Sequence, residues 1–412
     1  MMESETMKSA AMPLRIDSLS HDQLAILSRE HQLAGHIIDR SGMPIVTARG
    51  LDVMRDVAIE EWMGASPIYA KRMQRLLDFE GSTVEVALKG FQFDIGSPPE
   101  YMDFRLSVED DHHGAFHLKH CGALMDVEPM GEEFVTTMCH HIEDPTFDAT
   151  GWATNPKLRM RPEHRPPRTP RDRQPHCSWT VTIDEDSEET PTPERARLIG
   201  RSSAAQLPLS RMSGRTDDGY LDYRRPLDPD LRHADFASGA LRAVIDEIDL
   251  QAHLLVISFA WAVGERFGPE EALSMVGGQF TGIAGWAAER LVAAFGLGTK
   301  VVDLASTFEL HPAFHPRTYV DWTVEIDGEA VRLKLGDCPA REGDGFTNWV
   351  AALASGDLRP LQAIAFAVDP HYTVCQDGED CWIVDRGDTP NMESDEVMIT
   401  KFTTATSFRL ER

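Results

Sequence analysis

The sequence predicts an α+β protein in which one unit, helices followed by antiparallel strands, occurs twice, with the second copy degenerate. Two stretches that begin at Gly64 and Gly282 share their order of features. Further on, YMDFRLSVEDD from residue 101 matches YVDWTVEIDG from residue 319. Because few residues are identical between the copies, the shared order of helical and alternating patterns carries this prediction.

The duplication divides the chain into four segments. They are a tail at 1–17, a first repeat and active domain at 18–186, a linker at 187–235, and a second, structural repeat at 236–412. Each repeat is expected to close on a strand, CSWTVTID from residue 177 and TATSFRL from residue 403.

The first repeat is expected to begin with helices. Apolar residues at three- and four-residue spacings predict one helix over 51–64 and another over 66–79. Ser66 and Pro67 suit the N-cap and first helical position of the second helix.

A hairpin and a further helix follow. Alternating residues predict strands at 104–108 and 115–121, joined by a polar turn. An apolar stripe predicts a helix from about residue 128, which Asp144 and Pro145 are expected to end because proline disfavours helix in the residue before it.

Composition narrows the classes of partner. The 412 residues include 40 basic and 67 acidic ones, so the net charge is −27 and a nucleic-acid partner is not expected. The longest apolar stretch, at 254–263, is too short to span a bilayer, and no targeting signal is recognised at the N-terminus. Six scattered cysteines are typical of a reducing compartment. We therefore expect a cytoplasmic protein without a membrane partner, and the sequence leaves homo-oligomerisation open.

Histidine and cysteine concentrate in two stretches, 112–121 and 139–144. In the strand at 115–121 the side chains alternate, so His120 is expected to point inward with its apolar neighbours. On the following helix, positions three or four apart lie side by side. His120, Cys139, His140 and Glu143 are therefore the candidate ligands of a divalent ion, Zn, Mn or Fe.

The same stretches supply candidate catalytic residues. His141 and Asp144 are candidates for proton transfer, and Cys121 is an alternative ligand or a nucleophile. The metal would activate water or polarise a carbonyl group.

A Pro- and Arg-rich segment at 151–175 follows the constellation. Asn155, Arg159 and Arg161 in it are the candidate residues for binding a small anionic substrate, because arginine binds carboxylates bidentately. The competing interpretation is that this arm docks on the protein's own acidic surface.

The second copy lacks the constellation. Where the sequences are aligned, His120 falls on Leu335, and the 139–144 stretch has no clear counterpart. Scaffolding that the fold requires should appear in both copies, so this absence favours one active repeat.

The order of helices, a strand ending in HLKHCGAL, and a later CHHIED resembles the L-2-amino-thiazoline-4-carboxylic acid hydrolase family. The resemblance covers about residues 55–150. It implies hydrolytic opening of a thiazoline ring and dependence on a metal. It also implies that Cys121, Cys139 and Asp144 correspond to the cysteine and acidic positions of the family pattern.

Together these features predict a metal-dependent hydrolase or lyase that acts on a small carboxylate-bearing organic substrate. The family resemblance implies a cyclic one. One alternative is a pair of small-molecule-binding or sensor domains without catalysis, which predicts a deep apolar pocket. The other is an iron(II)-dependent oxidoreductase with the same ligands.

Overall fold

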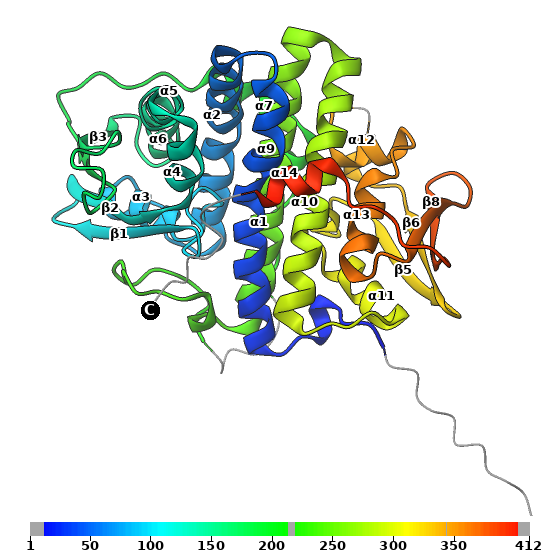
Figure 1. The fold of residues 1–412 in the computed structure, drawn as a ribbon. Coiled ribbons are helices and arrows are strands. Elements are labelled where there is room, and N and C mark those ends of the chain that lie inside the picture. The colour runs from blue at the N-terminus through cyan, green and yellow to red at the C-terminus, as the bar shows by residue number, and fades with distance from the viewer. Residues whose placement is uncertain (1–11, 213–218, 343, 403–412) are drawn as a thin grey trace, which may run out of the picture.

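A computed structural model describes residues 12–212, 219–342 and 344–402. The chain has two halves, each with one four-stranded antiparallel sheet, and the two sheets lie on either side of a central group of long helices (Figure 1). The predicted α+β class and the duplicated helix-then-sheet unit are confirmed.

Half one contains the elements that precede residue 207. They are η1 (Ile16–Ser18), α1 (His21–Thr47), α2 (Leu51–Leu76), α3 (Val84–Phe91), β1 (Met102–Val108), β2 (His113–Cys121), α4 (Gly122–Val127), η2 (Glu128–Met130), α5 (Glu132–Thr136), η3 (Thr137–Ile142), α6 (Glu143–Trp152), β3 (Leu158–His164), β4 (Cys177–Ile183), α7 (Glu194–Ile199) and α8 (Ser203–Gln206).

Half two repeats this order with shorter connecting pieces. Its elements are η4 (His233–Asp235), α9 (Ser238–Phe267), α10 (Pro269–Phe295), α11 (Val301–Leu310), η5 (Pro312–Phe314), β5 (Trp322–Asp327), β6 (Ala330–Leu335), η6 (Pro339–Arg341), α12 (Trp349–Ala354), α13 (Arg359–Val368), β7 (Tyr372–Gln376), β8 (Cys381–Arg386) and α14 (Asp395–Lys401).

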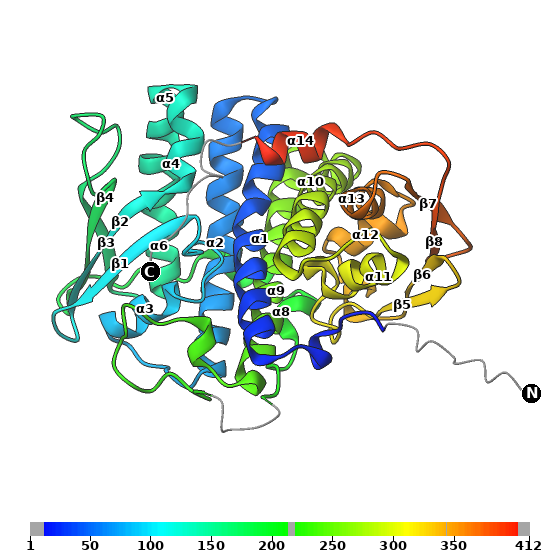
Figure 2. The same cartoon turned by 60° about the horizontal axis from the view of Figure 1, so that its bottom comes forward.

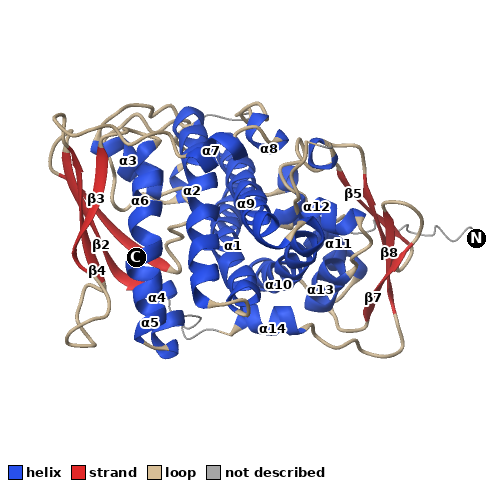
Figure 3. Cartoon of the chain, turned by 90° about the horizontal axis from the view of Figure 1, so that it is seen from above, coloured by secondary structure: helices blue, strands red, loops and turns tan. Residues whose placement is uncertain are grey.

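The two sheets have the same strand order, β1-β2-β4-β3 and β5-β6-β8-β7. They occupy opposite ends of the molecule, with the long helices between them (Figures 2 and 3). Shorter helices, α4 to α6 in half one and α11 to α13 in half two, fill the layer between each sheet and the long helices (Figure 3). This layer in half one carries the predicted constellation.

The long helices α1, α2, α9 and α10 exchange partners across the two halves. The buried ion pair Arg72–Glu247 joins α2 to α9 at 2.7 Å, and Arg290–Glu30 joins α10 to α1 at 2.7 Å. Each half therefore packs its second long helix on the first long helix of the other half, as expected for an internal two-fold relation.

Small residues allow this close approach. A Cβ atom at Gly64 would meet the hydroxyl of Ser258, and one at Gly282 would meet the Cβ of Ser41. Helix backbones approach this closely only where one side chain is absent at the contact. The two crossings use equivalent residues, which extends the internal two-fold relation to the packing.

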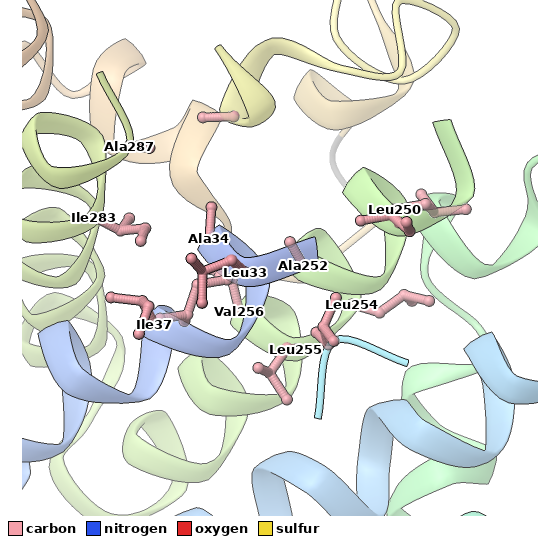
Figure 4. Close-up of a cluster of buried hydrophobic side chains, with 14 of the residues drawn as sticks. Leu33, Ala34, Ile37, Leu250, Ala252, Leu254, Leu255, Val256, Ile283 and Ala287 are labelled. Atoms are coloured by element: carbon pink, nitrogen blue, oxygen red, sulfur yellow. The ribbon is translucent and has the colours of Figure 1, made fainter. Parts of the chain in front are cut away.

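The core of this bundle is apolar. Leu33 and Ile37 of α1, Leu254 of α9 and Ile283 of α10 meet there (Figure 4). All four are at most 5% exposed, and burial of each such side chain contributes about 1.5–3 kcal/mol to folding. The apolar stretch at 254–263 lies inside α9. Among the described residues, no helix combines the length and apolar character needed to cross a membrane.

Two predicted helix boundaries are wrong. α2 continues through Ser66 and Pro67, because its packing against α9 compensates for the hydrogen bond that proline removes. The helix at Asp144 and Pro145 also continues, as α6. The preceding turn, η3, is π-helical, so the α-helical ladder is already interrupted where Pro145 lacks its N–H group.

The strands agree with expectation only in part. The hairpin of β1 and β2 and the strand β4 lie where they were predicted. The Arg-rich segment contains an unpredicted strand, β3. In half two the place of β4 is taken by β8, whereas the strand predicted from residue 403 lies outside the described residues.

The sheet register also changes the alignment of the copies. Phe104 pairs with Leu118 in half one, and Trp322 pairs with Leu335 in half two. Leu118, rather than His120, is therefore the counterpart of Leu335, and Cys121 corresponds to Cys338. The sequence alignment was displaced because the turns between the paired strands differ in length.

Candidate functional site

Three pairs of His and Cys residues that are adjacent in the sequence come together in half one. Cys121 ends β2, Cys177 begins β4, and Cys139 lies on η3. β2 and β4 are adjacent, and the backbone N–H of His176 donates to the carbonyl of Leu118 at 2.8 Å. The sheet therefore brings the first two cysteines together, and η3 packs over them from the helical layer.

We call Cys121, Cys139, Cys177 and Glu143 the thiol cluster. The three cysteines are 4%, 2% and 6% exposed, and all are free thiols. Burial raises the pKa of Cys177 to about 12, and burial together with the neighbouring acidic groups raises the pKa of Cys121 and Cys139 well above the ordinary range. At neutral pH these sulfur atoms are therefore protonated.

Glu143 is the acidic member of the cluster. Burial raises the pKa of its carboxyl to about 8, Arg165 opposes this shift, and Asp144 adds to it. Glu143 also raises the pKa of each of the three thiols, so it lies close to all of them. A carboxyl group that titrates near neutral pH can donate or accept a proton under working conditions.

The other predicted ligands and catalytic residues have different surroundings. The ring of His120 lies 5.7 Å from that of His176, whose pKa is lowered to about 4 by burial, Arg168 and His120. His140 shares a hydrogen bond of 2.7 Å between Nε2 and the carbonyl of Pro166. His141 is exposed, and Asp144 forms an ion pair with Arg165.

The donor types of the thiol cluster suit zinc, but their arrangement does not. Within the described ranges, no three His, Cys, Asp or Glu side chains come together in a way that could hold a metal ion. The predicted ligands His120, Cys139, His140 and Glu143 are therefore not gathered into one such group in the part of the chain that the structure describes.

The arm at 151–175 folds over half one. Arg165 pairs with Asp144 and lies 5.7 Å above the ring of Trp179, while Arg168 pairs with Glu128 at 3.0 Å. With the Pro166–His140 hydrogen bond, these contacts hold the arm across η2, η3 and α6. The arm therefore covers the thiol cluster.

The predicted substrate-binding residues face away from that cluster. On β3 the buried side chains are Leu158 and Met160, so Arg159 and Arg161 lie on the outer face of the sheet. Arg161 pairs with Asp148 at 2.9 Å, and Arg159 donates to backbone carbonyl groups. The side-chain amide of Asn155 donates to the carbonyl of Ser82. These contacts fasten β3 to neighbouring segments.

A cavity of about 150 Å³ adjoins the thiol cluster, between α1, α3, β1 and the chain at 229–233. Its walls combine apolar and polar side chains, and its lining residues are Arg29, Phe91, Gln92, Ser97, Pro99, Met102, Phe104, Leu106, Pro229, Leu231, Arg232 and His233. Met102 lines the cavity, and its sulfur lies 3.6 Å from the sulfur of Cys121 in the thiol cluster.

Positive charge at the cavity comes from two arginines. Arg29 pairs with Glu100, whereas the guanidinium of Arg232 makes no ion pair with any residue that the structure describes. His233 is 5% exposed, with Nδ1 2.8 Å from the hydroxyl of Ser28. Burial, helped by Arg29, lowers the pKa of His233 to about 4, so its ring is neutral at pH 7.

The fold and these sites define a duplicated α+β protein with a thiol cluster in its first half and an arginine-lined cavity between that half and the chain at 229–233. No family model matches the chain, and no curated protein or solved structure matches it either. The L-2-amino-thiazoline-4-carboxylic acid hydrolase resemblance stays a prediction.

Sequence reasoning missed several residues of these sites. His176 and Cys177 had a usable signal, because they are a third His–Cys neighbour pair at a predicted strand. Arg29 and Arg232 had none, since about two hundred residues of chain separate two arginines that meet only in the folded protein.

Proposed function

We propose that the protein binds a small carboxylate-bearing organic compound in the cavity between α1, α3, β1 and the chain at 229–233. The observation that carries the proposal is the combination of two arginines, Arg29 and Arg232, with walls of Met102, Phe104 and Leu231. Guanidinium groups bind carboxylates through two parallel hydrogen bonds, and apolar walls accept the rest of the ligand.

The size of the cavity limits the ligand. Its 150 Å³ is below the range of roughly 300–1,000 Å³ usual for sites of drug-sized molecules. A cavity on the order of 150 Å³ can hold a body the size of benzene. The ligand is therefore a short aliphatic or single-ring acid, in agreement with the small anionic compound that the sequence predicts.

Binding of butyrate and of its neutral isostere butyramide, followed by NMR chemical-shift titration, tests this proposal. Butyrate should bind and butyramide should bind at least about tenfold more weakly, since one hydrogen bond to a charged group contributes about 1.5–3 kcal/mol. Arg232→Gln should reduce butyrate binding to the level of butyramide. Arg171→Gln is the matched control, because Arg171 is exposed and lies on the arm away from the cavity. Equal affinities for the acid and the amide would contradict the proposal.

A second candidate function is the predicted hydrolase or lyase activity on such a compound. The observation that favours it is the pKa of Glu143, which burial raises to about 8, in a cluster whose Cys121 contacts the cavity-lining Met102. A carboxyl of this kind can serve as a general acid or base. In this candidate Glu143 transfers the proton, and the arm at 165–168 excludes water from the thiol cluster.

Ring opening of 2-amino-thiazoline-4-carboxylate, the substrate that the family resemblance implies, tests the second candidate. Glu143→Gln should abolish turnover, and Glu133→Gln, an exposed residue on α5, should leave it unchanged. Turnover that appears only with added Zn²⁺ or Mn²⁺ would favour the metal-dependent version. Oxygen consumption with Fe²⁺ would favour the oxidoreductase alternative. Equal turnover in the two variants would exclude Glu143 from the chemistry.

A further inference from the structure

A pair of cysteines outside the thiol cluster lies on the hairpin of β7 and β8. This hairpin belongs to the second sheet, at the other end of the molecule from the first sheet (Figure 3). Cys375 lies on the edge strand β7, and Cys381 begins β8. Both are free thiols, and Cys375 is exposed whereas Cys381 is partly exposed. Unlike the buried thiols of half one, this pair is therefore accessible to a ligand in solution.

Both cysteine side chains lie on the outer face of the sheet. Val374 and Trp382, the residues next to them along the strands, are buried on the inner face. Side chains alternate along a strand, so Cys375 and Cys381 share the opposite face. Cys375 pairs with Ile383, which is two residues beyond Cys381 on β8. The two cysteines are therefore diagonal neighbours on one face of an antiparallel pair.

The spacing of diagonal neighbours decides what the pair can bind. Such neighbours lie about 7–8 Å apart, with their Cβ atoms somewhat closer. A disulfide requires Cα atoms about 4.4–6.8 Å apart, so a direct bond between these sulfur atoms needs movement of the backbone. An ion between the thiolates relaxes this requirement, because two metal–sulfur bonds of about 2.3 Å each, the length found with zinc, separate the sulfur atoms by up to about 4.6 Å. The pair therefore fits a bridging ion better than a disulfide.

We propose that Cys375 and Cys381 form a two-thiolate site for copper(I) on the outer face of the second sheet. Soft thiolate ligands favour copper(I), and this ion is stable with two sulfur ligands on opposite sides. Zinc takes four ligands in structural protein sites. Among the described residues, no three His, Cys, Asp or Glu side chains come together in a way that could hold a metal ion, so the pair suits an ion that needs only two ligands. This inference is independent of the carboxylate-binding cavity.

Positive charge beside the pair balances the bound complex. When copper(I) binds, each thiol releases one proton to solvent and forms one copper–sulfur bond, so the complex carries one negative charge. The guanidinium of Arg332 on β6 donates to the sulfur of Cys381 at 3.8 Å, although Asp327 and Asp377 pair with the same guanidinium. Lys334 on β6 is the register partner of Cys381 and makes no ion pair with any residue that the structure describes. The ammonium group of Lys334 is therefore available to balance the complex.

The first sheet indicates that serine is tolerated at this place in the fold. Trp179 of β4 and Trp382 of β8 are equivalent, because β2 and β6 pair with them in the same way. Ser178 precedes Trp179 as Cys381 precedes Trp382. Since Cys375 is exposed at the edge of the sheet, serine is also expected to fit there. Cys375→Ser and Cys381→Ser therefore remove one ligand each without loss of the fold.

Titration of the full-length protein with copper(I) under anaerobic conditions tests the proposal. The chromophoric chelator bicinchoninate competes for the ion, and its absorbance measures the copper(I) that the protein withdraws. Wild type should bind one equivalent at the hairpin, and Cys375→Ser and Cys381→Ser should each lose that full equivalent, because neither thiol alone holds the ion. Cys338→Ser, which removes a buried thiol of half two outside the pair, is the matched control and should keep the wild-type number of equivalents. Prior addition of Zn²⁺ should leave the copper(I) titration unchanged.

The outcomes decide whether the two thiols act as a pair. Wild-type stoichiometry in both variants would overturn the site, and a loss in only one of them would also overturn it, because a single thiol then holds the ion. Competition by an equal concentration of Zn²⁺ for the same equivalent would overturn the two-thiolate assignment. Copper(I) held by the buried thiol cluster does not affect this result, because the cluster is the same in wild type and in both variants. Circular dichroism and the melting temperature show that each variant is folded, and Cys375→Ala and Cys381→Ala repeat the test without a hydroxyl group.

Discussion

Equivalent positions of the two halves carry different chemistry on the same frame. Gly64 contacts Ser258 where α2 crosses α9, and Gly282 contacts Ser41 where α10 crosses α1. When the two halves are aligned on these crossings, Glu61 of α2 is equivalent to Gln279 of α10. Both residues are fully buried, and neither has a hydrogen-bond partner for its side-chain oxygen atoms among the described residues. The fold therefore tolerates a polar group here but requires no charge.

The same relation extends to the surrounding residues. His36 and His253 are equivalent. The ring centroid of His36 lies 5.0 Å from that of Tyr101, and the ring centroid of His253 lies 4.8 Å from that of Tyr319. Asp39 of half one corresponds to Val256 of half two. Both copies keep this His–Tyr contact. Asp39 and Glu61, by contrast, have no acidic counterpart at the equivalent positions of half two.

Acidic groups in half one have unusual ionisation as a result. Burial raises the pKa of Asp39 to about 7, even though the indole N–H of Trp62 donates to it at 2.9 Å and opposes the shift. Burial and then the charge of Asp39 raise the pKa of Glu61 well above its ordinary value. Because Val256 and Gln279 cannot ionise, half two has no counterpart of this pair.

The largest expected effect on stability comes from substitutions that break the two equivalent ion pairs one at a time. Arg72→Met leaves Glu247, which is 3% exposed, buried without its partner and should destabilise the protein by about 3–5 kcal/mol. Arg290→Met removes a pair whose arginine is 42% exposed and should cost about 1 kcal/mol or less. Urea denaturation of both variants measures the difference. The double variant Arg72→Met with Glu247→Leu should recover stability, and equal losses in the two single variants would contradict the difference in burial.

Exchange of Glu61 and Gln279 sharpens the comparison of the acids. The folded state raises the pKa of Glu61, so its stabilising contribution is present below the unfolded pKa and is lost as pH rises through the folded value. Glu61→Gln should therefore be more stable than wild type at pH 9 by roughly 2 kcal/mol, with little difference at pH 5. Gln279→Glu should show the opposite change at pH 9. Urea denaturation at both pH values provides the test, and a pH-independent difference would exclude ionisation as its cause.

Alanine at the two crossing glycines tests whether the helix packing is equivalent. Gly64→Ala and Gly282→Ala place a methyl group less than 3 Å from side-chain atoms of the facing elements, and each should cost about 1–3 kcal/mol despite the higher helix propensity of alanine. Gly90→Ala on α3 is the control, because nothing lies within 4 Å of the added methyl group. Thermal melting compares the three. Melting temperatures unchanged by the first two substitutions would show that the crossings are looser than described.

The smallest effect concerns thiol reactivity and leaves stability unchanged. In half two Cys375 is exposed, whereas the three thiols of the cluster in half one are buried and protonated. A thiol reagent at pH 7 should therefore label Cys375 rapidly and the cluster only on unfolding, and Cys375→Ser should remove the rapid phase. Elemental analysis of the same preparation measures its content of zinc, manganese and iron. One equivalent of metal, lost in Cys139→Ser, would show that the cluster rearranges around an ion.

Local patterns predicted much of the framework. The hairpin at β1 and β2 was predictable because alternating residues and a polar turn are properties of a short segment. Helix ends at Pro67 and Pro145 were not predictable in this way, since packing on α9 and the π-helical turn η3 override the local preference of proline. β3 was missed because its Arg and Pro content gives no regular alternation.

The candidate site was predicted only in part for a related reason. Cys121, Cys139 and Glu143 were expected and do come together, and so does Cys177, which was read only as a strand residue. His140 and Asp144 lie near but are held by the arm, at Pro166 and Arg165. Spacing along a helix identified neighbours on one element, but it could not show which groups on the arm would reach them first.

The sequence by itself determined the α+β class and the duplication, because periodicity of apolar residues and their repetition are written along the chain. Only the tertiary structure decided which residues meet. Arg29 and Arg232 line one cavity, and Cys139 lies near Cys177, through the packing of segments that are separate in the chain. Such contacts depend on the burial of the whole core, which no short stretch of sequence specifies.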